Sequence, residues 1–361
     1  MRAVVFPDYG VMPEVTDVAE PACPDDGVVI SVGATGVCRS DWHAWQGHDP
    51  VPLPHIPGHE LAGTIAQTGP AVTRWRPGDR VTVPFACGCG RCEYCRAGDT
   101  QVCPDQTQPG FTGPGSFAER VAIHAADTNL VALPDAVDAV TAASLGCRFA
   151  TAYRALTGHA RLRPGEWLAV HGCGGVGLSA VHIGAALGAR VIAVDVAGAA
   201  LDRARGLGAE YAVLSATNTD PAAVIHDLTG GGGAHVSVDA LGSAGTLASS
   251  VRSLRRRGRH VQVGLLVGAE AAPPVPMDLV IARELEIYGS HGMAAGDYPS
   301  MLAQVADGTL RPGLLVGEVI GLEQASPALA ALDGPPTTAG MTVVIPAADG
   351  PDAAGPGYPA V

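Results

Sequence analysis

The chain contains no lysine, and all 22 of its basic residues are arginine. This absence excludes a Schiff-base lysine, and with it the ordinary chemistry of pyridoxal phosphate enzymes. It also excludes a phosphate-binding loop of the GxxxxGK[ST] type, because that motif needs its lysine on the phosphates.

Positive charge is scarce as well. The chain has 22 basic and 35 acidic residues, which gives a formal net charge of -13. Nucleic acids and anionic membrane surfaces attract basic faces, so neither is expected as a partner. The one basic cluster, Arg252–Arg259, is predicted to be a solvated helix end before a strand rather than an anion site.

Long apolar runs are missing too. The most apolar region, residues 167–196, is broken by glycines and by His171, His182 and Arg190, so it is predicted to form a strand, a helix and a strand. The first eight residues show no signal-peptide pattern. We therefore expect a soluble, cytoplasmic protein, and 361 residues are enough for two domains.

Nine cysteines are present, and their odd number and short spacings suit metal binding better than disulfides. Cys89, Cys92, Cys95 and Cys103 have the spacing C-x2-C-x2-C-x7-C. Four thiolates on one lobe match a closed, tetrahedral structural zinc site. Cys87 lies close to this group but fits the spacing less well, and Cys23 and Cys173 receive no role.

A second set of metal-binding residue types is spread more widely along the chain. Cys38 and His59 offer a thiolate and an imidazole, and Cys147 is the candidate for a third ligand. A catalytic zinc usually has three protein ligands and one open position, so this set predicts a catalytic zinc site. Ser40 and His43 lie between the first two ligands and are candidates for passing a proton outward.

The secondary-structure pattern changes near residue 150. Before it, short strands are predicted at 28–37, 61–68, 80–85 and 117–124, bounded by glycine and proline. After it, strands are predicted at 166–172, 190–195, 211–214, 236–240 and 260–265, and helices alternate with them. That alternation indicates an α/β fold with a doubly wound parallel sheet.

The first strand after residue 150 ends in a GxGxxG motif, Gly172-Cys173-Gly174-Gly175-Val176-Gly177, and Asp195 ends the next strand. In this context the glycines let the backbone approach a pyrophosphate, and the acidic residue is placed to bind a ribose hydroxyl. Asp195 would repel a 2′-phosphate, which favours NAD over NADP. A plain tight turn is the alternative for this motif.

The order of these motifs resembles the zinc-containing medium-chain alcohol dehydrogenase family, from Met1 to about Ile345. The resemblance implies a GroES-like catalytic domain built from both chain ends, at 1–149 and 286–346. A Rossmann NAD-binding domain, 150–285, lies between them in sequence, and residues 347–361 are expected to be a flexible tail.

The resemblance also implies roles for the residues around the first zinc ligand. Ser40 takes the alcohol proton, and His43 carries it outward. Asp41 orients His59, and Glu60 coordinates the catalytic zinc transiently. Arg39 contacts the cofactor pyrophosphate.

Further roles implied by the resemblance concern the nicotinamide, on which Thr151 and Val176 would pack. Two departures weaken the expected hold on NAD. Many relatives carry a basic residue where this chain has Ala200, and many carry an arginine where it has Met341.

The implied activity is reversible oxidation of a primary or secondary alcohol to an aldehyde or ketone, with NAD and two zinc ions per chain. A homodimer or homotetramer is implied, with Pro273–Met277 and residues 284–288 near the contact. Two alternatives stay open at this point. One is a biosynthetic NAD(P)H-dependent carbonyl reductase with a narrow substrate, and the other is a redox-silent, zinc-stabilised binding protein of the same fold.

Overall fold

The computed structural model describes residues 1–334 and 340–346, so the predicted tail at 347–361 lies outside the described residues. The chain divides into two compact units. One combines Met1–Cys147 with the described residues from Gly292 onward, and the other is Arg148–His291. In the described part of the chain, no helix has the length and apolar character needed to cross a membrane.

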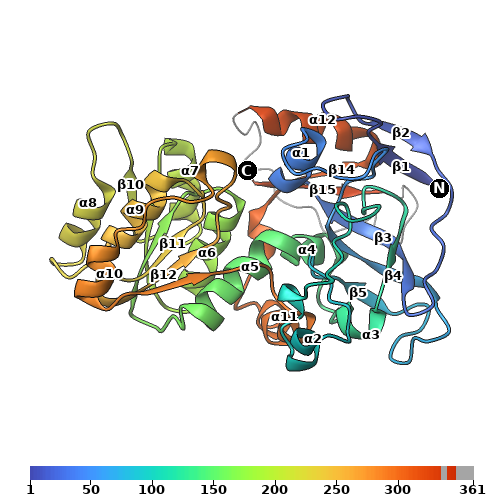
Figure 1. The fold of residues 1–361 in the computed structure, drawn as a ribbon, viewed down its shortest axis with the longest axis horizontal. Helices are drawn as coiled ribbons and strands as arrows, with labels where there is room; N and C mark the ends of the chain where they lie inside the picture. Colours follow the sequence, from blue (N-terminus) through green and yellow to red (C-terminus); the bar gives the residue numbers. More distant parts are fainter. Residues whose placement is uncertain (335–339, 347–361) are drawn as a thin grey trace. The chain divides into compact units, whose positions relative to one another are not determined.

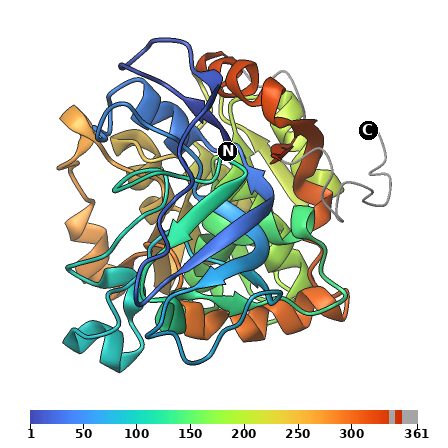
Figure 2. The same ribbon diagram turned by 90° about the vertical axis from the view of Figure 1, so that its right-hand side faces the viewer.

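The first unit is built on a seven-stranded sheet in which β3, Val28–Gly36, and β4, Glu60–Thr68, form the long antiparallel pair. These two strands lie side by side as blue arrows in Figure 2. Ile30, Leu61 and Ile65 are fully buried between the sheet and its loops. The sheet also contains β5 (Arg80–Thr82), β6 (Arg120–Ile123), β7 (Val131–Ala132), β14 (Val316–Gly321) and β15 (Met341–Ile345).

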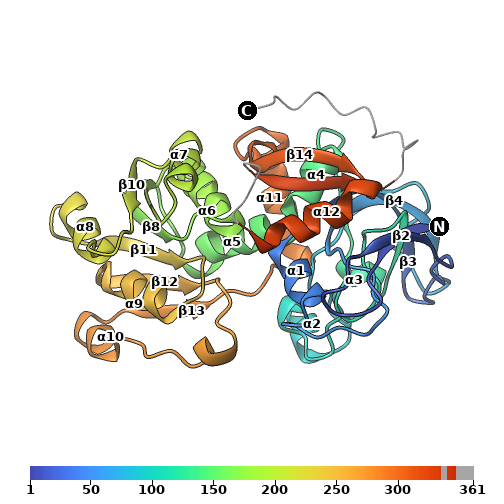
Figure 3. The ribbon, with the colours of Figure 1, turned by 90° about the horizontal axis from the view of Figure 1, so that it is seen from above.

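Short helices and a small hairpin complete this unit. Helices α1, Arg39–Trp45, and α12, Ala325–Ala330, lie side by side and bury Ala44, Trp45 and Leu329 (Figures 1 and 3). The other elements are β1 (Arg2–Val5), β2 (Glu14–Asp17), α2 (Glu93–Ala97), α3 (Ala126–Asn129), α4 (Ala139–Ala143), α11 (Tyr298–Ala306), η1 (Thr100–Val102), η5 (Ala295–Asp297), η6 (Pro312–Leu315), η7 (Leu322–Gln324) and η8 (Ala331–Asp333).

The second unit has a six-stranded parallel sheet in the order β10-β9-β8-β11-β12-β13. Renumbered from its first strand, this order is 3-2-1-4-5-6, the arrangement of dinucleotide-binding Rossmann folds. The predicted α/β fold class is therefore confirmed. The strands are β8 (Trp167–His171), β9 (Arg190–Asp195), β10 (Tyr211–Leu214), β11 (Ala234–Asp239), β12 (Leu254–Gln262) and β13 (Glu286–Gly289).

Helices cover both faces of this sheet: Figure 3 shows α6 and α7 on one face and α9 and α10 on the other. The predicted helix after β8 is present, because small residues let α6 pack closely on the strands. The helical segments are α5 (Ala150–Arg154), α6 (Gly175–Ala186), α7 (Gly198–Gly206), α8 (Pro221–Leu228), α9 (Ala244–Arg252), α10 (Met277–Arg283), η3 (Ala155–His159) and η4 (Gly268–Glu270).

Two details differ from the sequence expectations. Strand β13 pairs with β12, so the return to the first unit comes after His291 and not at residue 286. This four-residue edge strand lacks the apolar run of the central strands, so the sequence pattern did not predict it. The basic cluster lies mostly in β12, where Arg257 pairs with Glu284 at 2.8 Å and Arg259 pairs with Glu166 at 2.5 Å.

Candidate active site and metal centres

Four of the predicted ligands meet in the first unit. The ligand atoms of Cys38, His59, Glu60 and Cys147 all lie within 4.8 Å of one another. Cys38 precedes α1, His59 precedes β4, and Cys147 lies in a π-helical segment, η2, Leu145–Phe149. Such π-helical turns often occur at functional sites.

A buried carboxylate holds two of these residues in place. Asp41 Oδ1 accepts hydrogen bonds from His59 Nδ1 at 2.9 Å and from the Gly58 amide at 3.0 Å. Its Oδ2 accepts one from the Cys38 amide at 3.1 Å. Burial lowers the pKa of His59, but the Asp41 carboxylate outweighs it and raises that pKa well above the ordinary value.

The remaining nitrogen of His59 is directed at the other candidate ligands. Nε2 is buried and has no hydrogen-bond partner among the described residues. An unpaired buried polar atom is costly, and a metal ion would satisfy it. Two thiols, one imidazole and one carboxylate are also the donor types that zinc prefers. The residues present therefore fit a zinc ion.

Glu60 and Cys147 are linked through the backbone. The Cys147 amide donates to Glu60 Oε1 at 3.1 Å. A Cβ at Gly146 would lie 2.8 Å from Glu60 Cα, so only glycine allows this approach. The carbonyl of Gly146 accepts a hydrogen bond from the buried Tyr298 hydroxyl at 3.1 Å. Tyr298 thus supports the Cys147 loop, a role that the sequence analysis missed.

The predicted proton-transfer residues lie on α1. Ser40 Oγ is 3.8 Å from Cys38 Sγ. His43, five residues after Cys38, is half-buried, and burial is the main cause that lowers its pKa. The guanidinium of Arg39 stacks over the Trp42 ring, 4.9 Å from its centroid.

The second predicted metal group also comes together. The sulfur atoms of Cys89, Cys92, Cys95 and Cys103 lie within 4.8 Å of one another. Backbone N–H groups lower the pKa of Cys89 to about 6, whereas burial raises the pKa of Cys95 and of Cys103. A divalent cation would let all four exist as thiolates, so this lobe fits a structural zinc.

Asn129 fixes this lobe to the rest of the unit. Its side chain accepts from the Gly88 amide at 2.8 Å and donates to the Gly88 carbonyl at 2.9 Å. Among the described residues, Cys87 and Cys23 belong to neither metal group. The Cys87 thiol donates to the Pro84 carbonyl, and burial raises its pKa to about 12.

The glycine motif forms a tight turn between β8 and α6 in the second unit. Gly172 has φ +90°, and a Cβ at Gly177 would lie 1.8 Å from the Gly172 carbonyl oxygen. A Cβ at Gly174 would meet nothing within 4 Å, which leaves open space beside the start of a twelve-residue helix. This cradle fits the pyrophosphate of a dinucleotide.

Asp195 lies at the end of β9, as predicted. Its carboxylate accepts from the Cys173 amide at 2.6 Å and from the Ala197 amide at 2.8 Å, so the backbone fixes its position. Of the two predicted nicotinamide contacts, Thr151 is buried in α5 and Val176 lies in the first turn of α6.

A polar network behind this turn was not predicted. Asp239, at the end of β11, accepts from the amides of Leu241 and Gly242 and from the side chains of Thr246 and Gln262. It holds the turn that faces Gly172 across the sheet's switch point, where ligands of such folds bind.

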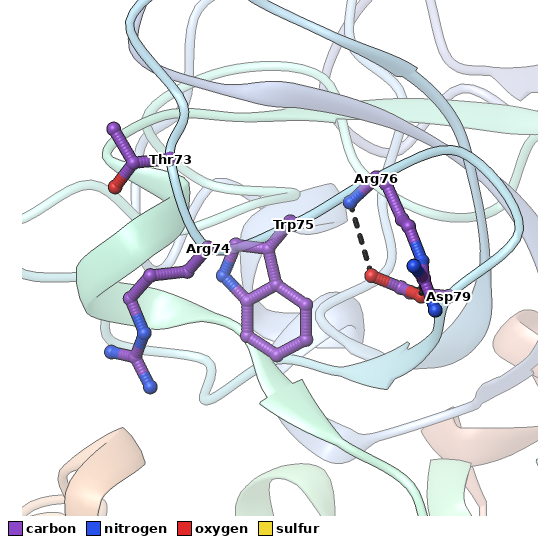
Figure 4. Close-up of a pocket in the computed structure, with 5 residues that line it drawn as sticks. All are labelled: Thr73, Arg74, Trp75, Arg76 and Asp79. Carbon is purple, nitrogen blue, oxygen red and sulfur yellow. Dashed lines mark hydrogen bonds and ion pairs between the residues drawn. The ribbon is translucent and has the colours of Figure 1, made fainter.

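A shallow pocket elsewhere in the first unit does not involve any of these residues. Thr73, Arg74, Trp75, Arg76 and Asp79 line it, on the loop between β4 and β5 (Figure 4). The Arg76 amide donates to Asp79 at 3.0 Å, and the amides of Thr73 and Arg74 donate to the Asp127 carboxylate, so these polar groups are already paired. We assign no function to it.

Comparison with known proteins gives two family matches. Residues 24–135 match the alcohol dehydrogenase GroES-like domain, and residues 175–307 match the zinc-binding dehydrogenase domain. An alcohol dehydrogenase from Geobacillus stearothermophilus is 33% identical over 316 residues, which are 86% of this chain and 90% of that protein.

Two further relatives cover almost the whole chain. An NAD-dependent alcohol dehydrogenase from Sulfurisphaera tokodaii is 33% identical over 91% of this chain and 95% of its own length. The solved structure of an alcohol dehydrogenase from Thermus sp. ATN1 superposes with a TM-score of 0.88 and 29% identity, covering 96% of this chain and 100% of that one.

Proposed function

The chain belongs to the zinc-containing medium-chain alcohol dehydrogenase family, and on that premise we propose that it transfers hydride reversibly between a primary or secondary alcohol and NAD. The observation that carries the proposal is the meeting of Cys38, His59, Glu60 and Cys147 around the unpaired Nε2 of His59. Cys38, His59 and Cys147 would hold a zinc ion, and Glu60 would reach it transiently.

A zinc ion held at this site would supply Lewis-acid chemistry, which makes the hydroxyl of an alcohol easier to deprotonate. The protein's own residues orient the metal ligands and move the proton that the alcohol releases. Asp41 keeps the Nδ1 proton of His59 and so presents Nε2 to the metal. Ser40 is the nearest hydroxyl to Cys38 on α1 and would take the alcohol proton, which His43 would carry outward.

The cofactor is proposed to be NAD rather than NADP. The fixed carboxylate of Asp195 favours ribose hydroxyls and repels a 2′-phosphate. The glycine turn would take the pyrophosphate, with Arg39 as a further contact. Ala200 and Met341 supply no positive charge where relatives do, so we expect weak NAD binding compared with those relatives.

Several finer points belong to the same proposal. We propose two zinc ions per chain, with Cys89, Cys92, Cys95 and Cys103 holding the structural one. We propose a catalytic domain at 1–149 and 286–346 and a cofactor domain at 150–285, and the division of the chain into two compact units near these limits supports the proposal. We also propose that the enzyme acts in the cytoplasm.

We propose in addition a homodimer or homotetramer. The edge strand β13 leaves one side of the six-stranded sheet unpaired within the described chain, and nearby Met277 and Ile281 are 50% and 75% exposed. An edge strand beside exposed apolar side chains is suited to pairing with a second copy. Light scattering on the purified protein would measure the assembly directly.

The test is the appearance of NADH with aliphatic and benzylic alcohols at alkaline pH, measured beside zinc content per chain. We expect turnover and two zinc ions in the wild type. Cys38→Ala should lose one zinc and all turnover, whereas Cys23→Ala, outside both groups, should keep both. Alcohol oxidation by Cys38→Ala would contradict the assignment of the catalytic zinc.

A failure of turnover would point to one of two rivals. Two zinc ions and NADH binding without alcohol oxidation would favour a carbonyl reductase with a narrow substrate. Two zinc ions without binding of NADH or NADPH would favour a redox-silent binding protein.

A further inference from the structure

A second histidine lies directly against His43 on the first unit. The Nδ1 atoms of His43 and His48 are 3.2 Å apart, and the ring centroids are 5.4 Å apart. Because both contacting atoms are ring nitrogens, one must donate and the other accept. The two imidazoles are therefore joined by one hydrogen bond.

The backbone fixes this pair. Helix α1 ends at Trp45, and Gly47 with φ +73° turns the chain back. The His48 amide then donates to the His43 carbonyl at 2.9 Å. The indole of Trp42 lies against both imidazoles, at centroid distances of 5.0 and 5.3 Å. The turn at Gly47 and the indole of Trp42 therefore hold the two imidazoles together.

The pair leads from the interior to water, because His43 is half-buried and His48 is exposed. The titratable neighbours of His43 on α1 and the following turn are Cys38, Arg39, His48 and Asp49. Of the segments that pack against α1, α12 has no ionisable side chain, η8 contributes Asp333, and the N-terminal loop that hydrogen-bonds to Trp45 contributes Asp8 and Tyr9.

We propose that His48 is the outer member of a two-histidine proton relay, which receives the proton from His43 and releases it to water. The proposal rests on the proposed function and deepens it. Oxidation of an alcohol yields a carbonyl compound, a hydride on the nicotinamide and one proton. This proton must reach water in every catalytic cycle, so a group that passes it on contributes to the rate of turnover.

The proton count follows from the observed contact. His43 Nδ1 faces His48, so Nε2 of His43 is the nitrogen left to accept a proton from the reaction. As Nε2 gains that proton, Nδ1 of His43 gives its own to Nδ1 of His48. His48 then loses a proton from Nε2 to water. One proton enters and one leaves, and exchange with solvent restores both tautomers.

The test uses His48→Gln, which keeps a polar side chain but cannot relay a proton. We expect its single-turnover rate of alcohol oxidation near neutral pH to fall by about tenfold, which is smaller than the loss typical of a general base at the reacting atoms. Addition of the hindered base 2,6-lutidine should restore the rate. Zinc content and NADH affinity should stay at wild-type values.

A double-mutant cycle separates relay from packing. In a His43→Gln background the His48→Gln change should slow the reaction no further, because His48 acts through His43. Equal losses in both backgrounds, or no rescue by lutidine, would overturn the relay. His124→Gln, an exposed histidine elsewhere on the unit, is the matched control and should not alter the rate.

A spectroscopic readout does not depend on turnover. His48 is one of the groups that lower the pKa of His43, after burial. Titration of the histidines by NMR should therefore show a higher pKa for His43 in His48→Gln. An unchanged pKa would contradict the contact. If the wild-type protein oxidises no alcohol, both the proposed function and the relay are contradicted. If the wild type turns over and His48→Gln has the same rate, only the relay is contradicted.

Discussion

Asp41 organises the candidate metal site with a single side chain. Its two oxygens accept from the Cys38 amide, the Gly58 amide and His59 Nδ1, and it is fully buried. A carboxylate with three donors is well satisfied despite its burial. Because Asp41 accepts a hydrogen bond from the Nδ1–H of His59, His59 can present only Nε2 to the other ligands.

We expect Asp41→Asn to lose the catalytic zinc. The amide keeps one oxygen but turns an NH2 group toward N–H donors, so at least one hydrogen bond fails and His59 loses its orientation. Loss of such a partner typically weakens metal binding by about 10- to 100-fold. Zinc analysis after dialysis against a chelator should find one ion per chain, with turnover lost.

The exposed Asp17→Asn is the matched control for this measurement and should retain two zinc ions. Two zinc ions in Asp41→Asn after the same dialysis would show that His59 is oriented by something else.

At the scale of single residues, the sequence could predict the ligands and, through the family resemblance, Asp41, but not the other supports. Cys38, His59 and the four-cysteine lobe are visible because residue type and spacing carry their chemistry. Tyr298, Asn129 and His48 are common residue types whose partners lie far away in sequence or across a turn. Only the folded chain brings Tyr298 to Gly146, 152 positions away.

At the scale of elements, the turn between β8 and α6 sets how closely helix and strand can pack. A Cβ at Gly177 would lie 1.8 Å from the Gly172 oxygen, whereas a Cβ at Gly174 would meet no atom within 4 Å. Gly174 also has a negative φ of -77°. The two glycines of one motif therefore have separable roles, one in packing and one in ligand approach.

We expect Gly177→Ala to destabilise the cofactor-free protein by about 1–3 kcal/mol, because the helix must move off the strand. Gly174→Ala should leave stability unchanged but weaken NADH binding, since its methyl group would fill the cradle. Denaturant unfolding and NADH fluorescence titration measure the two effects. Equal stability of the two variants would mean that the turn relaxes without cost.

Elements with a long, regular pattern were predictable. Strands β9 and β10 have the predicted bounds. The misses have physical causes: β13 is an edge strand without an apolar run, and the π-helical turn at Cys147 contains Gly146, whose close approach to Glu60 cannot be read from the local sequence. Local sequence does not encode such features, because tertiary packing decides them.

At the scale of the whole molecule, the parallel sheet of the second unit contains buried polar side chains. His260 is buried in β12, where its ring lies 3.2 Å from Ser237 Oγ and 3.0 Å from Ser250 Oγ. His171 is buried in β8, and its Nε2 has no hydrogen-bond partner among the described residues. The sequence showed His171 only as a break in an apolar run.

These two histidines predict how stability depends on pH. Burial lowers the pKa of His171 to about 3 and that of His260 to about 4, below the ordinary value of 6.5. Both stay neutral in the folded protein, so below about pH 6.5 the unfolded chain binds more protons. Stability should therefore fall as pH decreases, by about 3 kcal/mol for the pair between pH 6.5 and 5.0.

Urea unfolding followed by tryptophan fluorescence across this pH range would measure the loss, and two variants isolate its source. His171→Leu should remove about half of the pair's share, about 1.5 kcal/mol, and flatten the pH dependence. The exposed His124→Gln should keep the wild-type slope. Protonation of the zinc ligands at low pH affects the wild type and both variants alike. Only a difference between proteins in the slope of the unfolding free energy against pH therefore tests the role of His171. If His171→Leu kept the full wild-type slope, the acid sensitivity would have to arise from the metal sites and not from the buried sheet histidines.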